Sequence, residues 1–361
     1  MDDREISGIL IHWYEKNKRE LPWRETGDPY LIWISEIILQ QTRVAQGLDY
    51  FNRFVQRFPD VRSLAEVDED EVMKYWQGLG YYSRARNLHA AAKQIVDSFD
   101  GVFPRTREDI LSLKGIGDYT AAAIASFAYQ QPYATVDGNV YRVLARLFDL
   151  EMPIDSGEGK KYFTELAQSL LDERHPDLFN QAMMEFGALQ CVPKSPACDS
   201  CPLNGKCLAL ASGRVEQLPV KNGKTMVKPR YFNYLHIRGQ GKTLLSKRTG
   251  NDIWRNLYEF PLVETASPVS WGELQQVAGF NTLFGGMTGI NVKREFTAKK
   301  HVLSHRVIYA VFYEILVDAF SPAMQKYLQV PDEEVGNYAV SRLVQSYLEK
   351  RETLLDRKSV V

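Results

Sequence analysis

The sequence predicts a multidomain protein in which an all-α N-terminal domain precedes a separate α+β domain. Apolar residues recur with helical spacing through the first 210 residues, without a clear strand pattern. All four cysteines fall between Cys191 and Cys207, at the end of this helical part. After a polar stretch, the pattern changes to short apolar runs typical of strands. We therefore expect domains at residues 1–210 and 229–361, joined by a linker at 211–228.

The composition is that of an ordinary globular protein. The chain has 361 residues, of which 25% are charged and 45% hydrophobic, and its formal net charge is -1. This charge gives no support to nucleic-acid binding, although contact with phosphates requires only a local basic patch. No apolar run reaches the length of a membrane span, and the acidic start lacks the pattern of a signal peptide. We therefore expect a cytoplasmic protein with no membrane partner.

The second predicted helix carries a candidate catalytic acid. A first amphipathic helix, around residues 6–14, is followed by the Leu21-Pro22 step, and a new helix starts after Asp28 and runs to Thr42. This second helix is apolar almost all round, so Glu36 in its middle should be buried. Burial disfavours the charged carboxylate and raises its pKa toward neutrality, as a general acid requires. The alternative is a buried glutamate paired with an arginine or a helix end.

A glycine-rich stretch interrupts the helices at Gly78–Arg86. Its small residues, adjacent tyrosines and paired arginines suit a loop that inserts a side chain into a base stack while cations hold the phosphates. A plain aromatic connection between helices is the alternative. Further on, Thr106 with Asp109 predicts a helix N-cap.

A glycine hairpin at Leu113–Gly117 is the central feature of the helical domain. Gly115 and Gly117 allow a tight turn that presents backbone amides at a helix start, where a phosphate oxygen can bind. Asp137 lies 20 residues beyond Gly117 and precedes a helical pattern, so it should cap that helix and stay ionised. An anion held there can face a developing cation. An ordinary turn and an ordinary N-cap are the alternatives.

The cysteines form the most specific motif in the chain. In a reducing compartment, such a cluster favours metal ligation over disulfide bonds. Four thiolates can converge on one soft metal centre, and the donor type alone leaves zinc and iron both open. The candidate ligands are Cys191, Cys198, Cys201 and Cys207.

The C-terminal part shows strand signals and fewer helices. Strands are predicted at Tyr231–Ile237, Leu244–Ser246, Val292–Phe296 and Val307–Leu316, and helices near Trp271–Val277 and Val340–Glu349.

Taken together, these motifs resemble the MutY family of adenine DNA glycosylases, within the endonuclease III or helix-hairpin-helix superfamily. The resemblance covers nearly the whole chain. It implies a helix-hairpin-helix glycosylase domain of two helical subdomains, a 4Fe-4S cluster on the cysteines of an iron-sulfur loop at 191–207, and a C-terminal Nudix-like domain that recognises 8-oxoguanine. The segments that carry it are Trp33-Ile34-Ser35-Glu36 with Leu39-Gln40-Gln41-Thr42, Gly78-Leu79-Gly80-Tyr81-Tyr82, the hairpin, Val136-Asp137-Gly138-Asn139 and the cysteine loop.

The resemblance implies removal of adenine mispaired with 8-oxoguanine or guanine in double-stranded DNA, by a monomer that is nucleoid-associated if bacterial. The adenine must leave the stack to be reached. Glu36 would protonate its N7, and Asp137 would stabilise the oxocarbenium-like sugar, with Asn139 and Tyr119 assisting. The implied DNA and base contacts are Trp23, Arg24 and Gln181 around the adenine, Gln41, Thr42, Leu79, Gly80 and Tyr81 at the base pair and the vacated stack, and Gly115 and Gly117 at the backbone.

Three differences from related proteins refine this expectation. Endonuclease III-type lyases carry a lysine where this chain has Tyr119, so we expect base removal without efficient strand cleavage. The Nudix-like domain lacks the acidic magnesium-binding helix, so we expect no nucleotide hydrolysis. Ser304 and His305 correspond to the family's 8-oxoguanine-reading loop, although Leu303 stands where phenylalanine is more usual.

Two other functions stay open from sequence alone. One is a thymine or oxidised-pyrimidine mismatch glycosylase on the same scaffold, against which Trp23, Arg24 and Gln181 argue. The other is a non-catalytic mismatch-binding protein, in which the carboxylates serve only as a cap and a buried pair. We expect the cluster to fix a basic loop, with Lys194 and Lys206, against phosphates, and to have no redox role.

Overall fold

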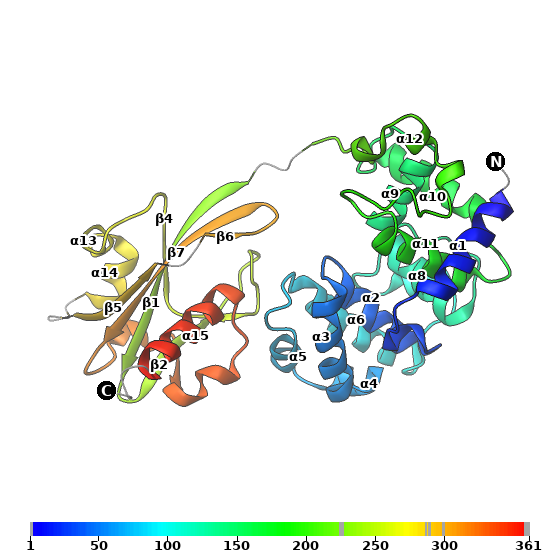
Figure 1. Ribbon diagram of the computed structural model, residues 1–361. Helices are drawn as coiled ribbons and strands as arrows, with labels where there is room; N and C mark the ends of the chain where they lie inside the picture. The colour runs from blue at the N-terminus through cyan, green and yellow to red at the C-terminus, as the bar shows by residue number, and fades with distance from the viewer. Residues whose placement is uncertain (1–2, 224–226, 286, 288–289, 298–299, 357–361) are drawn as a thin grey trace. The chain divides into compact units, whose positions relative to one another are not determined.

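The chain folds into two compact units (Figure 1). The first consists of residues 1–66 and 87–223, and the second of residues 67–86 and 224–361. No helix in the described part of the chain is long and apolar enough to cross a membrane. The computed structural model describes residues 3–223, 227–285, 287, 290–297 and 300–356.

The first unit is helical, as the sequence predicts. The short helix α5 (Glu69–Tyr75) belongs to the second unit, and α6 begins there. The helices of the first unit are α1 (Asp3–Asn17), η1 (Pro22–Arg24), α2 (Pro29–Leu39), α3 (Val44–Arg57), α4 (Val61–Glu66), α6 (Ser83–Phe99), α7 (Arg107–Ser112), α8 (Asp118–Tyr129), α9 (Gly138–Leu147), α10 (Gly157–Leu170), α11 (Pro176–Leu189), η2 (Asn204–Lys206), α12 (Leu208–Ala211) and η3 (Val215–Gln217).

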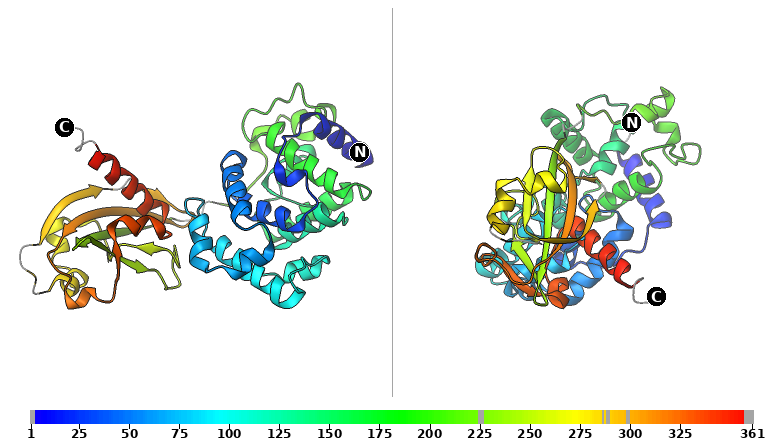
Figure 2. Two further views of the ribbon diagram at one scale, coloured as in Figure 1. Left: turned by 90° about the horizontal axis from the view of Figure 1, so that it is seen from below. Right: turned by 90° about the vertical axis from the view of Figure 1, so that its left-hand side faces the viewer.

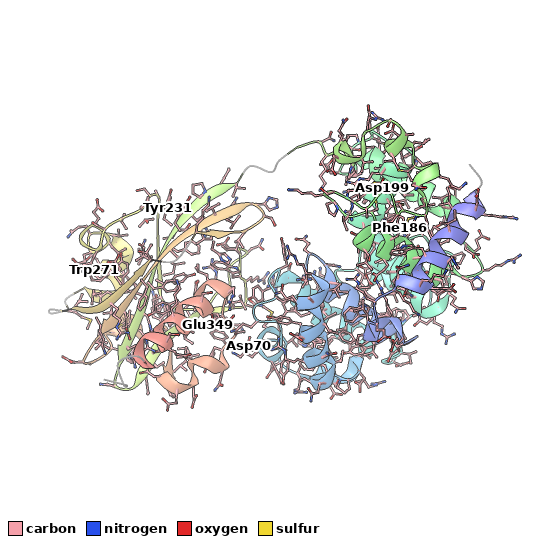
Figure 3. The ribbon with its side chains drawn as sticks, in the orientation of Figure 1. Asp70, Phe186, Asp199, Tyr231, Trp271 and Glu349 are labelled. Atoms are coloured by element: carbon pink, nitrogen blue, oxygen red, sulfur yellow. The ribbon has the colours of Figure 1, made fainter. Side chains whose placement is uncertain are left out.

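Apolar packing fixes the helices that later carry the polar site. Helices α1, α9, α10 and α11 share one buried core. In that core, Phe186 of α11 (Figure 3) packs edge to face against Trp13 of α1, with ring centroids 5.0 Å apart. Helix α2 packs against α3 and α8. The elements that carry Glu36, Tyr119 and Asp137 are therefore held by packing that does not depend on those polar side chains.

The second unit contains a mixed β-sheet. Among the described residues eight strands take part, in the order β3-β2-β1-β7-β5, with β4 paired to β1, β6 to β7 and β8 to β2. Strands β1 and β7 are parallel, with Tyr231 opposite Tyr309, and the other strand pairs are antiparallel. The elements are β1 (Lys228–Gly239), β2 (Lys242–Lys247), β3 (Tyr258–Glu259), β4 (Leu262–Thr265), α13 (Trp271–Leu274), α14 (Ala278–Phe284), β5 (Asn291–Thr297), β6 (His301–Val302), β7 (Arg306–Leu316), η4 (Pro322–Met324), β8 (Leu328–Pro331), η5 (Asp332–Asn337) and α15 (Arg342–Asp356).

Helices cover both faces of this sheet (Figures 1 and 2). Successive side chains of a strand point to opposite faces. On one face, Phe232 and Phe312 pack with Tyr347 of α15. On the other, Tyr313 and Ile315 pack with α13 and α14. The sheet therefore has two separate apolar cores.

Helix α5 and the glycine-rich stretch after it pack with the strands of the second unit. Asp70 is labelled in Figure 3. Tyr258 Oη donates a hydrogen bond to Asp70 Oδ2 at 2.7 Å, and Lys247 forms an ion pair with the same carboxylate. These contacts explain why residues 67–86 group with a domain far away in the sequence.

The structure corrects several details of the sequence-based expectation. The helix expected to run to Thr42 ends at Leu39, and residues 83–86, expected in a loop, begin α6. Strands β3, β4, β6 and β8 were missed because each has only two to four residues, too few for a visible alternation. The stretch expected as a linker starts inside the first unit, where Leu218 is buried and Ile154 N donates to Val220 O at 3.1 Å.

Candidate active site

A cavity of about 620 Å³ lies within the first unit. Its wall comes from η1, α2, the start of α8, the N-cap of α9 and one face of α11. Both predicted acid groups therefore face one cavity, although they come from different parts of the sequence. The predicted site residues that line it are Trp23, Arg24, Glu36, Gln41, Thr42, Gly117, Tyr119, Asp137, Asn139 and Gln181.

Glu36 is a buried carboxyl group on α2, with 7% of its surface exposed. The helix starts where Asp28 caps the backbone N–H of Tyr30 at 2.8 Å. Tyr119 Oη donates to Glu36 Oε2 at 2.9 Å. Burial is the largest influence and raises the pKa of Glu36 from 4.5 to about 7; Tyr119 and Arg24 lower it, and Asp137 raises it further. A carboxyl group in this range can release a proton near neutral pH.

Tyr119 stands in the first turn of α8, directly after the hairpin. Burial, followed by the charges of Glu36 and Asp137, raises the pKa of Tyr119 well above its usual value. The phenol therefore stays protonated, and in this structure it donates its hydrogen bond to Glu36.

Asp137 is the N-cap of α9, as predicted. Its Oδ1 accepts hydrogen bonds from the backbone N–H groups of Asn139 and Val140, both at 2.8 Å, and its Oδ2 accepts one from Asn139 Nδ2, also at 2.8 Å. These bonds and the nearby Arg142 lower its pKa, but burial is stronger, so the pKa lies above its usual value. The sequence had pointed only to the helix N-terminus and its stabilising effect.

Arg142 links this cap to the cysteine loop. Its Nη2 donates to Asn139 Oδ1 at 2.8 Å and to Gly187 O at 2.6 Å, while its Nε donates to Cys191 O at 2.8 Å. The orientation of the Asn139 amide, and through it that of Asp137, is therefore tied to the first cysteine of the loop.

The far wall of the cavity holds polar residues that the sequence analysis missed. Glu185 of α11 is fully buried and forms ion pairs with Arg24 at 2.7 Å and Arg19 at 2.6 Å. Tyr14 Oη donates at 2.7 Å to Oε1 of Gln181, which also lines the cavity. The sequence did contain a signal for Glu185. Like Glu36, it is a single carboxylate within an apolar helical run, a pattern that indicates burial.

The hairpin has the backbone geometry that requires glycine at one position. Gly115 has a φ of +79°, and a Cβ atom there would lie 2.5 Å from Cβ of Asn87. Gly117 is the N-cap of α8 and lines the cavity, and a Cβ atom there would meet nothing within 4 Å. Gly115 forms the turn and is not part of the cavity wall.

Leu79, Gly80 and Tyr81 belong to the second unit and differ in exposure. Leu79 is buried, with 7% exposed, whereas 48% of Tyr81 is exposed. The Arg84 guanidinium lies 5.6 Å from the centre of the Tyr81 ring. Of the two side chains, Tyr81 is therefore the one exposed at the surface.

The turn between β6 and β7 carries the two predicted lesion-reading residues. Leu303 N donates to Arg306 O at 2.8 Å and closes the turn, and Leu303 itself packs on the core beneath. Ser304 and His305 are exposed. Ser304 Oγ lies 3.2 Å from Tyr81 Oη, so the two predicted DNA-contacting loops of this unit touch.

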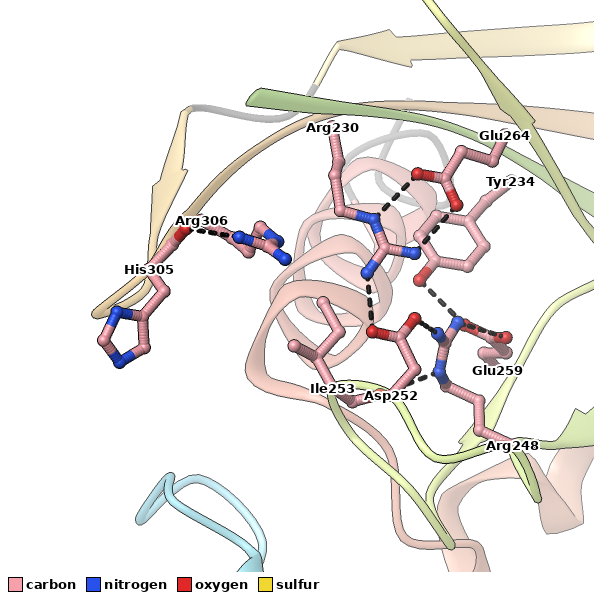
Figure 4. Close-up of polar contacts among 9 residues, drawn as sticks. All are labelled: Arg230, Tyr234, Arg248, Asp252, Ile253, Glu259, Glu264, His305 and Arg306. Atoms are coloured by element: carbon pink, nitrogen blue, oxygen red, sulfur yellow. Dashed lines mark hydrogen bonds and ion pairs between the residues drawn. The ribbon is translucent and has the colours of Figure 1, made fainter. Parts of the chain in front are cut away.

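An ion-pair network supports the strands behind this turn (Figure 4). Arg230 pairs with Glu264 at 2.7 Å and with Asp252 at 2.8 Å. Arg248 pairs with Asp252 at 2.7 Å and with Glu259 at 2.8 Å. The imidazole of His305 points away from these residues in Figure 4, and the residue is exposed.

All four cysteines line one small cavity, of about 30 Å³. The buried Arg146 fixes the loop around it, since its Nη1 donates to Cys191 Sγ at 3.4 Å and to Val192 O at 2.7 Å. In the described residues, no three His, Cys, Asp or Glu side chains form a group that could hold a single metal ion. Four thiols around a shared cavity nevertheless match the donor set of a soft metal centre.

Comparisons with known proteins agree with this architecture. Residues 34–169 match the HhH-GPD superfamily of base excision DNA repair proteins, and residues 233–350 match the NUDIX domain. A thermostable thymine-DNA glycosylase is 29% identical in sequence, with a TM-score of 0.54, over 58% of this chain and 97% of that one. An endonuclease III trapped on DNA shares the fold at 22% identity, with a TM-score of 0.51, over 59% of this chain and 99% of that one. Fold and site together define a helix-hairpin-helix base excision repair protein with a Nudix domain.

One curated relative identifies the family. The adenine DNA glycosylase of Buchnera aphidicola subsp. Baizongia pistaciae is 33% identical over 315 residues, which are 86% of each chain. This chain belongs to the adenine DNA glycosylase family.

Proposed function

We propose that this protein hydrolyses the N-glycosidic bond of adenine mispaired with 8-oxoguanine or guanine in double-stranded DNA. The observation that carries the proposal is one cavity lined by Glu36, whose pKa is raised to about 7, and by Asp137 at a helix N-terminus. Such a pair of carboxyl groups with different environments is the arrangement that glycosidic bond hydrolysis uses.

The reaction begins when the adenine leaves the base stack and enters the cavity. Glu36 donates its proton to N7 of the adenine, the bond between the sugar and the base breaks, and the electron pair leaves with the base. The Asp137 carboxylate then stabilises the cationic sugar, through its charge or a transient bond. Water adds to the sugar carbon, and its proton returns to Glu36.

Other cavity residues assist these two. Tyr119 holds Glu36 in place through its hydrogen bond, and Asn139 does the same for Asp137. Trp23, a buried ring that packs edge to face on Phe51 at 5.1 Å, gives the base a rigid apolar wall. Arg24 and Gln181 would offer polar contacts to its edge, and Gln41 and Thr42, which also line the cavity, would contact the base pair.

DNA contacts outside the cavity follow from the loops. Gly115 and Gly117 would bring the hairpin amides to the phosphate backbone. Tyr81, with Leu79 and Gly80 shaping its turn, would fill the vacated stack. Ser304 and His305 would read the oxidised edge of 8-oxoguanine, since both are exposed and polar.

We infer a monofunctional enzyme, because Tyr119 supplies a phenol where a lyase needs an amine. Excision should leave an abasic site that breaks only after treatment with hot alkali. The test is to incubate a duplex containing adenine opposite 8-oxoguanine, with and without alkali. Strong nicking before alkali would contradict the absence of lyase activity, and no released adenine would contradict the proposal as a whole.

We further infer that the four cysteines hold a 4Fe-4S cluster, with zinc as the alternative. When bound, the cluster would fix the loop that carries Lys194, which is exposed. Lys206 is already paired with Glu5 at 2.8 Å, so we assign the phosphate contact to Lys194. Analysis of the purified protein for iron, sulfide and zinc decides between the two metals.

A thymine mismatch glycosylase is the second candidate, favoured by the 29% identity to the thermostable thymine-DNA glycosylase. Base release from a panel of defined mismatches separates the two substrates. A non-catalytic mismatch binder would release no base from any of them.

A further inference from the structure

Glu185 is a fully buried carboxylate in the wall of the catalytic cavity. It accepts four hydrogen bonds. Its Oε1 receives the backbone N–H and Nε of Arg19 at 3.1 and 2.7 Å, and its Oε2 receives Nη2 of Arg19 at 2.6 Å and Nη2 of Arg24 at 2.7 Å. Both carboxylate oxygens are therefore occupied by two arginines from the segment before α2.

This carboxylate stays ionised over the whole pH range of an enzyme assay. Burial alone would raise its pKa, but hydrogen bonds from Arg19 and Arg24 and the charge of Arg24 together lower it to about 2. A buried charge of this kind is costly unless its partners are correctly placed. Since Arg24 is only 14% exposed in its side chain, the pair is almost fully removed from water.

Arg24 connects Glu185 with the reacting groups. It lines the cavity, and its Nη1 is buried without a hydrogen-bond partner in the described part of the chain. Its positive charge also acts on Glu36 and on Tyr119. A buried donor without a partner is expected to gain one from a ligand, and the edge of a purine offers ring nitrogens as acceptors.

We propose that Glu185 is a positioning residue for adenine excision: it holds the Arg24 guanidinium with Nη1 free for the base, and it balances the Arg24 charge beside Glu36. The inference rests on the proposed function. It extends that function by giving a role to a residue that does not itself touch the reacting atoms.

The charge balance predicts a specific pH effect. The groups that face Glu36 are Tyr119 from α8, Asp137 from the cap of α9 and Arg24 from η1. Without the Glu185 charge, the Arg24 cation is less compensated and favours the ionised form of Glu36 more strongly. Glu36 then loses its proton at a lower pH, so the alkaline limb of the rate profile should move toward lower pH.

The experiment measures single-turnover adenine release as a function of pH for the full-length protein. Glu185→Gln should lower the rate by about 10²-fold, the loss expected when a group that contacts the substrate, here Arg24, is displaced. It should also move the alkaline limb to lower pH. Arg24→Gln should move that limb to higher pH. Combining both changes should lower the rate no further than Arg24→Gln alone, because Glu185 acts through Arg24.

Glu259→Gln is the matched control, because Glu259 is also a buried carboxylate paired with an arginine, Arg248, but belongs to the second unit. The inference is overturned if the Glu185→Gln rate falls equally at every pH, or if it matches the Glu259→Gln rate. In both cases, adenine excision by the wild type would still support the proposed function. If the wild type releases no adenine, the proposed function itself fails.

A conservative variant covers the case in which Glu185→Gln does not fold. Glu185→Asp keeps the charge but withdraws the carboxylate by one carbon. It should lower the rate through a misplaced Arg24 while leaving the alkaline limb where it is in the wild type. A wild-type rate in Glu185→Asp would contradict the positioning role.

Discussion

Replacing Glu36 with glutamine should remove most of the excision activity and make the protein more stable at alkaline pH. The carboxyl group is 7% exposed, and burial raises its pKa from 4.5 to about 7. At about 1.4 kcal/mol for each tenfold change in proton affinity, ionising Glu36 costs the folded protein about 3 kcal/mol. The stability given by the protonated form is complete below pH 4.5 and is lost as the pH rises through about 7.

Glutamine has nearly the same shape, still accepts the Tyr119 hydrogen bond and carries no charge at any pH. The free energy of unfolding, measured by denaturant titration, should therefore match the wild type in acid and exceed it by up to about 3 kcal/mol in alkali. Single-turnover excision should fall by about 10²- to 10⁴-fold, the usual contribution of a general acid. Binding to the mismatched duplex should persist.

Two results would refute this reasoning. Near-wild-type excision by Glu36→Gln would show that another group supplies the proton. A stability difference that is the same in acid and in alkali would show that burial does not control the titration of Glu36.

Four further changes test other parts of the site. Tyr119→Phe removes the hydrogen bond that lowers the pKa of Glu36, so the alkaline limb of the excision profile should move to higher pH; an unmoved limb would contradict that coupling. Asp137→Asn keeps a good N-cap, so the melting temperature should change little while excision falls by about 10²-fold or more; a large loss of stability would show that the cap argument is wrong. Gly115→Ala should destabilise the fold by about 1–2 kcal/mol because of its positive φ, whereas Gly117→Ala, which has open space, should be neutral in the same unfolding assay. Replacing Ser304 and His305 together with alanine should reduce the preference for 8-oxoguanine over guanine without slowing release of adenine opposite guanine, and unchanged discrimination would remove their reading role.

Features that depend on one helix could be predicted from the sequence. Glu36 is a single charge in an apolar run, which indicated burial, and the structure confirms it. Asp137 and Thr106 each precede a helical pattern, and both cap their helices as predicted. In each case the physical cause lies within a few residues of the side chain, so a local pattern is sufficient.

Features that depend on distant partners could not be predicted in this way. The ion pair between Glu185 and Arg19 joins residues 166 positions apart, and no local pattern specifies which cation a buried carboxylate will meet. Leu79 and Tyr81 were both expected at the base pair and the vacated stack, yet packing buries Leu79 and leaves Tyr81 exposed. The raised pKa of Asp137 likewise results from tertiary burial that its N-cap pattern does not reveal.

Burial raises the pKa of both cavity carboxyl groups, and the distribution of hydrogen-bond donors favours Glu36 as the acid and Asp137 as the anion of the proposed reaction. Asp137 accepts three N–H bonds at 2.8 Å and sits at a helix N-terminus, and both features favour its charged form. Glu36 accepts a single bond from a neutral phenol, and the charge of Asp137 adds to the cost of ionising it. We therefore predict that an ionised Asp137 keeps the proton on Glu36 until a purine nitrogen is present to take it. Reversing the roles would require a proton on Asp137, which accepts three hydrogen bonds, and a charge on Glu36, which accepts one. The same interactions oppose both changes.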